Sequence, residues 1–193
     1  MIPEPIAVTL LVIEVLDQLG VAYLVGGSLA STVHGELRTT LDADLVADLH
    51  PEHIAPFVKA LASAFYVDEG MIREALDRRG GFNLIHLETM FKVDVFVPKL
   101  RAFDREQMRR RARHVVVAEP ELAIYVATAE DTILAKLEWY RLGGGVSERQ
   151  WRDVIGVITV QAERLDTAYL RCWAPSLGVA DLFEQALAEA GAH

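Results

Sequence analysis

Two aspartates close together in the sequence have a spacing that suits a metal ion. Asp42 and Asp44 stand at positions i and i+2 of an apolar run, and two residues so spaced on a strand project from one face of a sheet. Carboxylate oxygens are hard ligands that suit Mg²⁺, which completes its shell with water and substrate phosphates. The sequence therefore predicts a Mg²⁺ site at this pair.

A third carboxylate, Asp94, lies in the middle of the apolar run 91–97. On a buried sheet face an unpaired carboxylate is costly. We therefore expect Asp94 to lie beside a cation.

A glycine turn precedes the aspartates. Gly26 and Gly27 follow the short apolar run 21–25, and Ser28 opens residues 28–34, which can form a short helix. Two glycines let the backbone approach a phosphate, and a helix N-terminus attracts its charge. Each pattern alone is weak, because a lone strand aspartate is commonly an edge residue and Gly-Gly turns occur at many sharp bends. Their order along the chain favours a nucleotide phosphate site.

The elements that position these residues follow from hydrophobic periodicity. Helical spacing predicts a first helix that stops at Gly20, and the runs beside the glycine turn and the aspartates predict strands. The expected helices of this half are 5–19, 28–34 and 51–65, and the expected strands are 21–25, 41–47, 82–87 and 91–97, the last two forming a hairpin.

After Pro120 the pattern becomes helical throughout, with predicted helices at 129–141, 147–160, 166–173 and 179–190. Strands mixed with helices and then helices alone predict an α/β fold with a helical appendage. We expect a core at residues 1–118 and a helical C-terminal domain at 119–193.

Composition and charge narrow the class of protein. The 193 residues are 52% hydrophobic, carry a net charge of −9 and include one cysteine, Cys172, which excludes an internal disulfide. The apolar run 6–13 is far shorter than the roughly 20 residues that cross a membrane, so we expect a cytoplasmic protein. The basic segment 99–114 either binds a polyanion or is a solvated helix face.

The ordered motifs resemble a known family. The Gly26-Gly27-Ser28 turn, the string Arg38-Thr39-Thr40-Leu41-Asp42-Ala43-Asp44-Leu45 and a later strand carrying Asp94 look like the nucleotidyltransferase core of the DNA polymerase β superfamily. The Arg-x-Thr-x-Asp-x-Asp string and the helical half resemble the AbiEii type, toxins of bacterial toxin–antitoxin and phage-defence systems. The resemblance implies a mixed sheet flanked by helices, followed by a small all-helical domain.

The resemblance also implies roles for particular residues. Asp42, Asp44 and Asp94 would bind Mg²⁺ and act in catalysis, and the nucleoside triphosphate (NTP) would be bound by Gly26, Gly27, Ser28, Arg38 and Thr39. Lys136 and Asp153 match a catalytic lysine and aspartate of the AbiEii type. Without the family, Lys136 is a solvated helix residue and Asp153 half of a local ion pair with Arg149 or Arg152.

The implied activity is Mg²⁺-dependent transfer of a nucleoside monophosphate from an NTP to a macromolecule, either the 3′ end of tRNA or a protein hydroxyl. A toxin of this type would have a cognate antitoxin protein and no membrane partner. Two alternatives stand beside it: a small-molecule, aminoglycoside-like nucleotidyltransferase, and an inactive binding module with the same fold.

Overall fold

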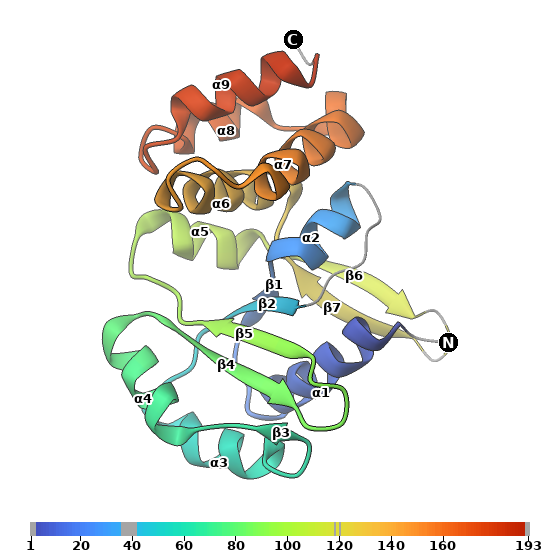
Figure 1. The fold of residues 1–193 in the computed structure, drawn as a ribbon, viewed down its shortest axis with the longest axis vertical. Helices are drawn as coiled ribbons and strands as arrows, with labels where there is room; N and C mark the ends of the chain where they lie inside the picture. Colours follow the sequence, from blue (N-terminus) through green and yellow to red (C-terminus); the bar gives the residue numbers. More distant parts are fainter. Residues whose placement is uncertain (1–2, 36–41, 118, 120, 192–193) are drawn as a thin grey trace. The chain divides into compact units, whose positions relative to one another are not determined.

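The computed structural model describes residues 3–35, 42–117, 119 and 121–191. It divides into two compact units, which we call the sheet unit (Met1–Gly26 and Thr40–Val126) and the helical unit (Gly27–Thr39 and Ala127–His193) (Figure 1). In the described part of the chain, no helix combines the length and apolarity needed to cross a membrane.

The sheet unit is built on one mixed sheet, in which the described residues supply seven strands in the order β3-β4-β5-β2-β1-β7-β6. The strands are β1 (Tyr23–Val25), β2 (Asp42–Ala47), β3 (Phe65–Tyr66), β4 (Gly81–His86), β5 (Lys92–Phe96), β6 (Ala112–Val117) and β7 (Leu122–Val126). The pairs β2–β5 and β1–β7 are parallel and the other pairs are antiparallel. The predicted hairpin of β4 and β5 is confirmed.

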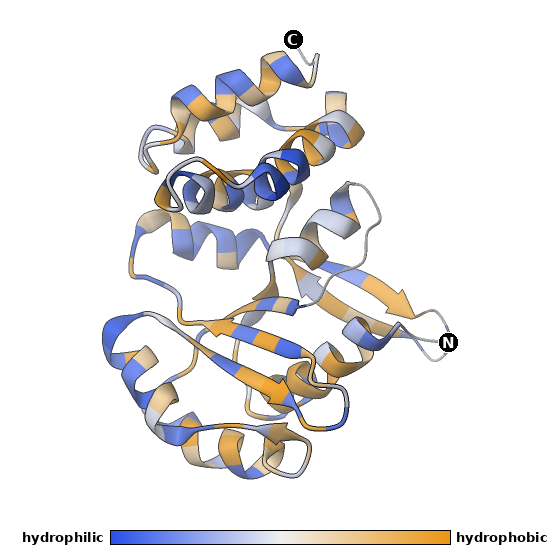
Figure 2. Ribbon diagram, viewed as in Figure 1, coloured by the Kyte–Doolittle hydropathy of each residue, from blue (hydrophilic) through white to orange (hydrophobic). Residues whose placement is uncertain are grey.

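The two faces of the central strands differ in burial. Side chains alternate along β2 and β5, and Figure 2 shows the matching alternation of hydrophilic and hydrophobic residues along β5. The buried face carries Ala43, Leu45, Val93 and Val95, and the half-buried face carries Asp42, Asp44 and Asp94.

Helices α1 (Glu4–Gln18), α3 (Pro51–Leu61) and α4 (Glu69–Arg78) cover the buried face of this sheet. The sheet unit has one further described helix, α5 (Ala102–Arg110). Phe57 of α3 meets Phe82 of β4 edge to face, with ring centroids 6.3 Å apart, an arrangement that aromatic quadrupoles favour. Helices α1 and α4 pack against α3, so their apolar sides close the core of the sheet unit.

The helical unit gathers segments from both ends of the sequence. Its described helices are α2 (Gly27–His34), α6 (Ala129–Leu142), α7 (Glu148–Gln161), η1 (Ala162–Arg164), α8 (Thr167–Trp173) and α9 (Ala180–Glu189). Helix α2 packs against α6 and α7. At its end, His34 Nε2 lies 2.6 Å from the carbonyl oxygen of Ala127, and Gln161 donates to the carbonyl oxygen of His34 over 2.6 Å. These bonds tie α2 to the helical unit.

Most predicted elements are present, but α5 and β6 were not predicted, and three other elements differ from the expectation. The helix expected at 51–65 ends at Leu61, and Phe65 begins β3. Helix α4 was not predicted, because half of its residues are charged; Asp68 caps it by accepting a hydrogen bond from the Met71 amide. The segment after Pro120 was expected to be helical throughout, but it begins with strand β7. This strand belongs to the sheet because it pairs with β1.

A buried tyrosine stands on the central strand β1. Tyr23 is 2% exposed, and its ring meets that of Tyr125 edge-on, with centroids 5.9 Å apart. The Arg111 guanidinium lies 4.8 Å from the centroid of the Tyr125 ring. Burial, reinforced by the charge of Asp17, raises the pKa of the Tyr23 phenol to about 12.

This pKa predicts a loss of stability in alkali. An unfolded tyrosine ionises near pH 10, whereas folded Tyr23 ionises at about 12. The stability contributed by the neutral phenol is therefore fully present below about pH 10 and is lost as the pH rises to about 12, by about 3 kcal/mol. Urea unfolding across this window should show the loss in the wild type and not in Tyr23→Phe.

Tyr66→Phe, which removes an exposed phenol, is the matched control and should keep the wild-type pH dependence. If Tyr23→Phe loses as much stability in alkali as the wild type does, ionisation of other groups causes the loss.

Candidate active site

The sheet unit brings the three predicted carboxylates to one face. In the parallel pairing of β2 and β5, Asp44 lies opposite Asp94 and Asp42 lies opposite Lys92. Residues in register on neighbouring strands project from the same side of a sheet. Asp42, Asp44, Lys92 and Asp94 therefore share one half-buried surface, which we call the carboxylate face.

Lys92 is the cation of this face. Its Nζ donates to Asp94 Oδ2 over 2.7 Å, with the lysine side chain 44% and the aspartate 20% exposed. The hydrogen bond to Asp94 raises the pKa of Lys92, and the charges of Asp94, Asp42 and Asp44 raise it further. We expected a cation beside Asp94 but missed Lys92, although its position two residues earlier on the strand was a signal in the sequence.

The carboxylate face has the donor chemistry for Mg²⁺. Its oxygens are the hard ligands that this ion prefers, and they come from adjacent strands. Among the described residues, however, no group of three or more His, Cys, Asp and Glu side chains stands close enough together to hold a metal ion. The residues thus fit Mg²⁺ in kind, with Asp94 engaged by Lys92.

Gly26 directly follows strand β1, beside the carboxylate face. Its amide donates to the Asp44 carbonyl oxygen over 2.8 Å, which holds it against the neighbouring strand β2. A Cβ at Gly26 would lie 4.0 Å from that oxygen and from Leu24 Cδ1, and the backbone is not left-handed. The fold therefore does not require glycine at this position.

Gly27 begins α2 in the helical unit, and here the backbone favours glycine, because its φ is +53°. The next residue, Ser28, is buried, and its hydroxyl accepts a hydrogen bond from Arg149 over 3.2 Å. A guanidinium beside the N-terminus of a helix is an arrangement that attracts anions. The other residues expected to bind the triphosphate, Arg38 and Thr39, lie outside the described residues.

A buried ion pair joins two further predicted residues in the helical unit. Lys136 of α6 donates to Asp153 of α7 over 2.7 Å, and the side chains are 9% and 8% exposed. The interpretation of Lys136 as a solvated helix residue is therefore wrong. The packing of α6 against α7 brings the two side chains together. The helical periodicity of either segment alone does not predict this contact.

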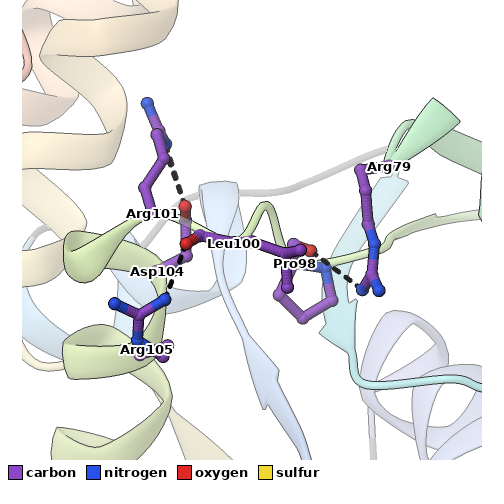
Figure 3. Close-up of polar contacts among 6 residues, drawn as sticks. All are labelled: Arg79, Pro98, Leu100, Arg101, Asp104 and Arg105. Atoms are coloured by element: carbon purple, nitrogen blue, oxygen red, sulfur yellow. Dashed lines mark hydrogen bonds and ion pairs between the residues drawn. The ribbon is translucent and has the colours of Figure 1, made fainter.

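The arginines of the basic segment 99–114 make many local contacts. Figure 3 shows Arg79 and Arg105 reaching the carbonyls of Pro98 and Leu100, in the connection between β5 and α5. In the segment, Arg101 pairs with Asp104, Arg109 with Glu106 and Arg113 with Glu121, and Arg111 donates to the Met108 carbonyl. Less of the positive charge is available to a polyanion than the sequence suggests.

Comparison with known proteins assigns the fold. No protein-family model matches the sequence, and no curated protein matches it significantly. An antigenic nucleotidyltransferase-like protein from Paracoccidioides brasiliensis matches with 18% identity and a TM-score of 0.50, over 89% of this chain and 90% of the other. The antibiotic-resistance factor ANT(2'')-Ia matches with 12% identity and a TM-score of 0.55, over 96% and 98% of the two chains.

A third solved structure, the lincomycin-bound lincosamide antibiotic adenylyltransferase LnuA, matches with 13% identity and a TM-score of 0.51, over 77% of this chain and 93% of the other. At such identities the likeness shows the fold alone. The chain has a nucleotidyltransferase-like fold, as expected, and the likeness to the AbiEii type rests on the sequence motifs.

The buried pair in the helical unit predicts a strong effect of a single substitution. Lys136→Met removes the lysine that donates to the buried Asp153 carboxylate, and removal of one member of a buried ion pair costs about 3–5 kcal/mol. Urea unfolding should show this loss, and the double variant Lys136→Met/Asp153→Leu should recover much of it.

Arg171→Met is the matched control, because it breaks the exposed pair of Arg171 with Glu184 in the same unit; exposed pairs contribute little. Wild-type stability in Lys136→Met would show that the buried pair does not stabilise the fold.

Proposed function

We propose that this chain is a Mg²⁺-dependent nucleotidyltransferase that moves a nucleoside monophosphate from an NTP to a macromolecular hydroxyl, at the 3′ end of tRNA or on a protein, as the toxin of a toxin–antitoxin pair. The observation that carries the proposal is the register of β2 and β5, which puts Asp42, Asp44 and Asp94 on one face in a nucleotidyltransferase-like fold.

The carboxylates have distinct roles in this proposal. Asp42, Asp44 and Asp94 would hold Mg²⁺, which when bound would neutralise phosphate charge and activate oxygen nucleophiles. Asp94 accepts the proton of the attacking hydroxyl. That oxygen forms a bond to the α-phosphorus, the bond from the α-phosphorus to the bridging oxygen breaks, and pyrophosphate leaves with the electron pair.

The phosphates are bound by backbone and cationic groups. Gly26 and Gly27 let the backbone approach the β and γ phosphates, and the Ser28 hydroxyl donates to them. Arg149, which the sequence analysis did not assign, supplies positive charge beside Ser28. We assign Arg38 and Thr39 to the same phosphates.

We also assign a catalytic role to Lys136, as a charge that stabilises the leaving phosphates, and to Asp153, which orients it through their 2.7 Å hydrogen bond. These proposed roles fall on residues of the helical unit, whereas the carboxylates belong to the sheet unit.

A small-molecule acceptor is the second candidate. Two proteins with similar folds are described as an antibiotic-resistance factor and a lincosamide antibiotic adenylyltransferase. The net charge of −9 suits a cationic drug, and the arginine pairs of segment 99–114 reduce the positive surface available to RNA.

A labelling assay separates the acceptors. The protein, Mg²⁺ and each radiolabelled NTP are incubated with total tRNA, with cell protein, with an aminoglycoside or with a lincosamide. We expect label on tRNA or protein, and about a hundredfold or greater loss in Asp42→Asn/Asp44→Asn, since the metal contributes several kcal/mol to the transition state.

Asp48→Asn is the control, because Asp48 is an exposed carboxylate directly after β2, and it should label as the wild type does. Label on a drug alone would establish the small-molecule enzyme. Equal labelling by the double variant would contradict the assigned site, and failure to bind Mg²⁺–NTP would identify an inactive module.

The two glycines predict opposite outcomes when changed to alanine. Gly27→Ala should destabilise the protein by about 1–2 kcal/mol, because φ is +53°. Gly26→Ala should leave stability unchanged, because its Cβ has room, yet weaken NTP binding about tenfold by keeping phosphate from the backbone. Urea unfolding and calorimetric NTP titration measure the two effects, and wild-type NTP affinity in Gly26→Ala would remove Gly26 from the phosphate site.

A further inference from the structure

Lys92 occupies an unusual place for a lysine, because it stands among the carboxylates proposed to bind a metal. It lies on the same strand face as Asp94, two residues earlier, and opposite Asp42 on the neighbouring strand. Its Nζ is 2.7 Å from Asp94 Oδ2. The ammonium ion therefore supplies positive charge where the proposed divalent cation would supply it.

The two cations exclude each other at Asp94. Three carboxylates on one face repel one another, and a nearby positive charge offsets that repulsion. A divalent cation held by the same oxygens would repel an ammonium ion in contact with them. Binding of the metal thus favours separation of Lys92 from Asp94.

Exposure indicates which partner leaves. The Lys92 side chain is 44% exposed and that of Asp94 is 20% exposed. A lysine carries its charge on a flexible four-carbon stem, so the ammonium ion can turn into solvent while the shorter aspartate stays on the sheet. Asp94 is further enclosed by β4, where Asn83 lies opposite it in register.

We propose that Lys92 is a positioning residue that acts as the built-in counter-ion of the carboxylate face: it holds Asp94 while no divalent cation is bound and releases it when one binds. This inference deepens the proposed function and rests on it for the identity of the metal site. The residue regulates the site by competing with the cation for one ligand.

The first test measures metal binding without nucleotide. Calorimetric titration with Mn²⁺ compares the wild type with Lys92→Met and Lys92→Arg. Loss of the competing charge should make Lys92→Met bind Mn²⁺ about threefold to fivefold more tightly. Lys92→Arg should bind no more tightly than the wild type, because a guanidinium also pairs with a carboxylate.

The second test measures stability. In EDTA, the unfolding equilibrium constant of Lys92→Met should exceed that of the wild type by about threefold to fivefold, and saturating Mn²⁺ should remove this difference. In an Asp94→Asn background, Lys92→Met should have a smaller effect, because the two changes affect the same pair. Lys59→Met, which removes an exposed lysine from α3, is the control and should change neither measurement.

Equal or weaker Mn²⁺ binding by Lys92→Met would overturn the proposal, as would the absence of Mn²⁺ binding by both proteins. Failure of the proposed function alone would give a different result: the wild type would label no acceptor, yet Lys92→Met would still bind Mn²⁺ more tightly than the wild type. Failure of the inference alone leaves the labelled product intact with equal Mn²⁺ affinities.

Discussion

The parallel pairing of β2 with β5 is the contact on which the carboxylate face depends. It places Asp44 opposite Asp94, and a shift of one residue in either strand would send that strand's carboxylates to the buried face. The register is held by hydrophobicity, because Leu45 and Val95 on the same strands are fully buried. The alternation of side chains along β2 and β5 therefore produces both the apolar core of the sheet unit and its carboxylate face.

In the described structure, two of the buried or half-buried charged side chains have a partner of opposite charge. The half-buried Asp94 has Lys92, and the buried Lys136 has Asp153. A buried pair is retained at a desolvation cost, so by itself it is poor evidence of stability. In segment 99–114, Arg101 pairs with Asp104 and Arg109 pairs with Glu106.

Local patterns in the sequence were sufficient to predict most helices and strands. The spacing of apolar residues located the first helix and the hairpin of β4 and β5. Local patterns did not predict the elements that form only through a tertiary contact. Half of the residues of helix α4 are charged and its apolar side is narrow, and β3 is a two-residue strand that forms only against β4.

The sequence by itself determined the donor types and their order: a glycine turn, two aspartates with strand spacing and a third on a later strand. These are local properties, set by backbone conformation and side-chain alternation. Only the tertiary structure decided that Arg149 reaches Ser28 and that Lys136 is buried against Asp153. Both contacts depend on helix packing, which brings together residues whose pairing no periodicity specifies.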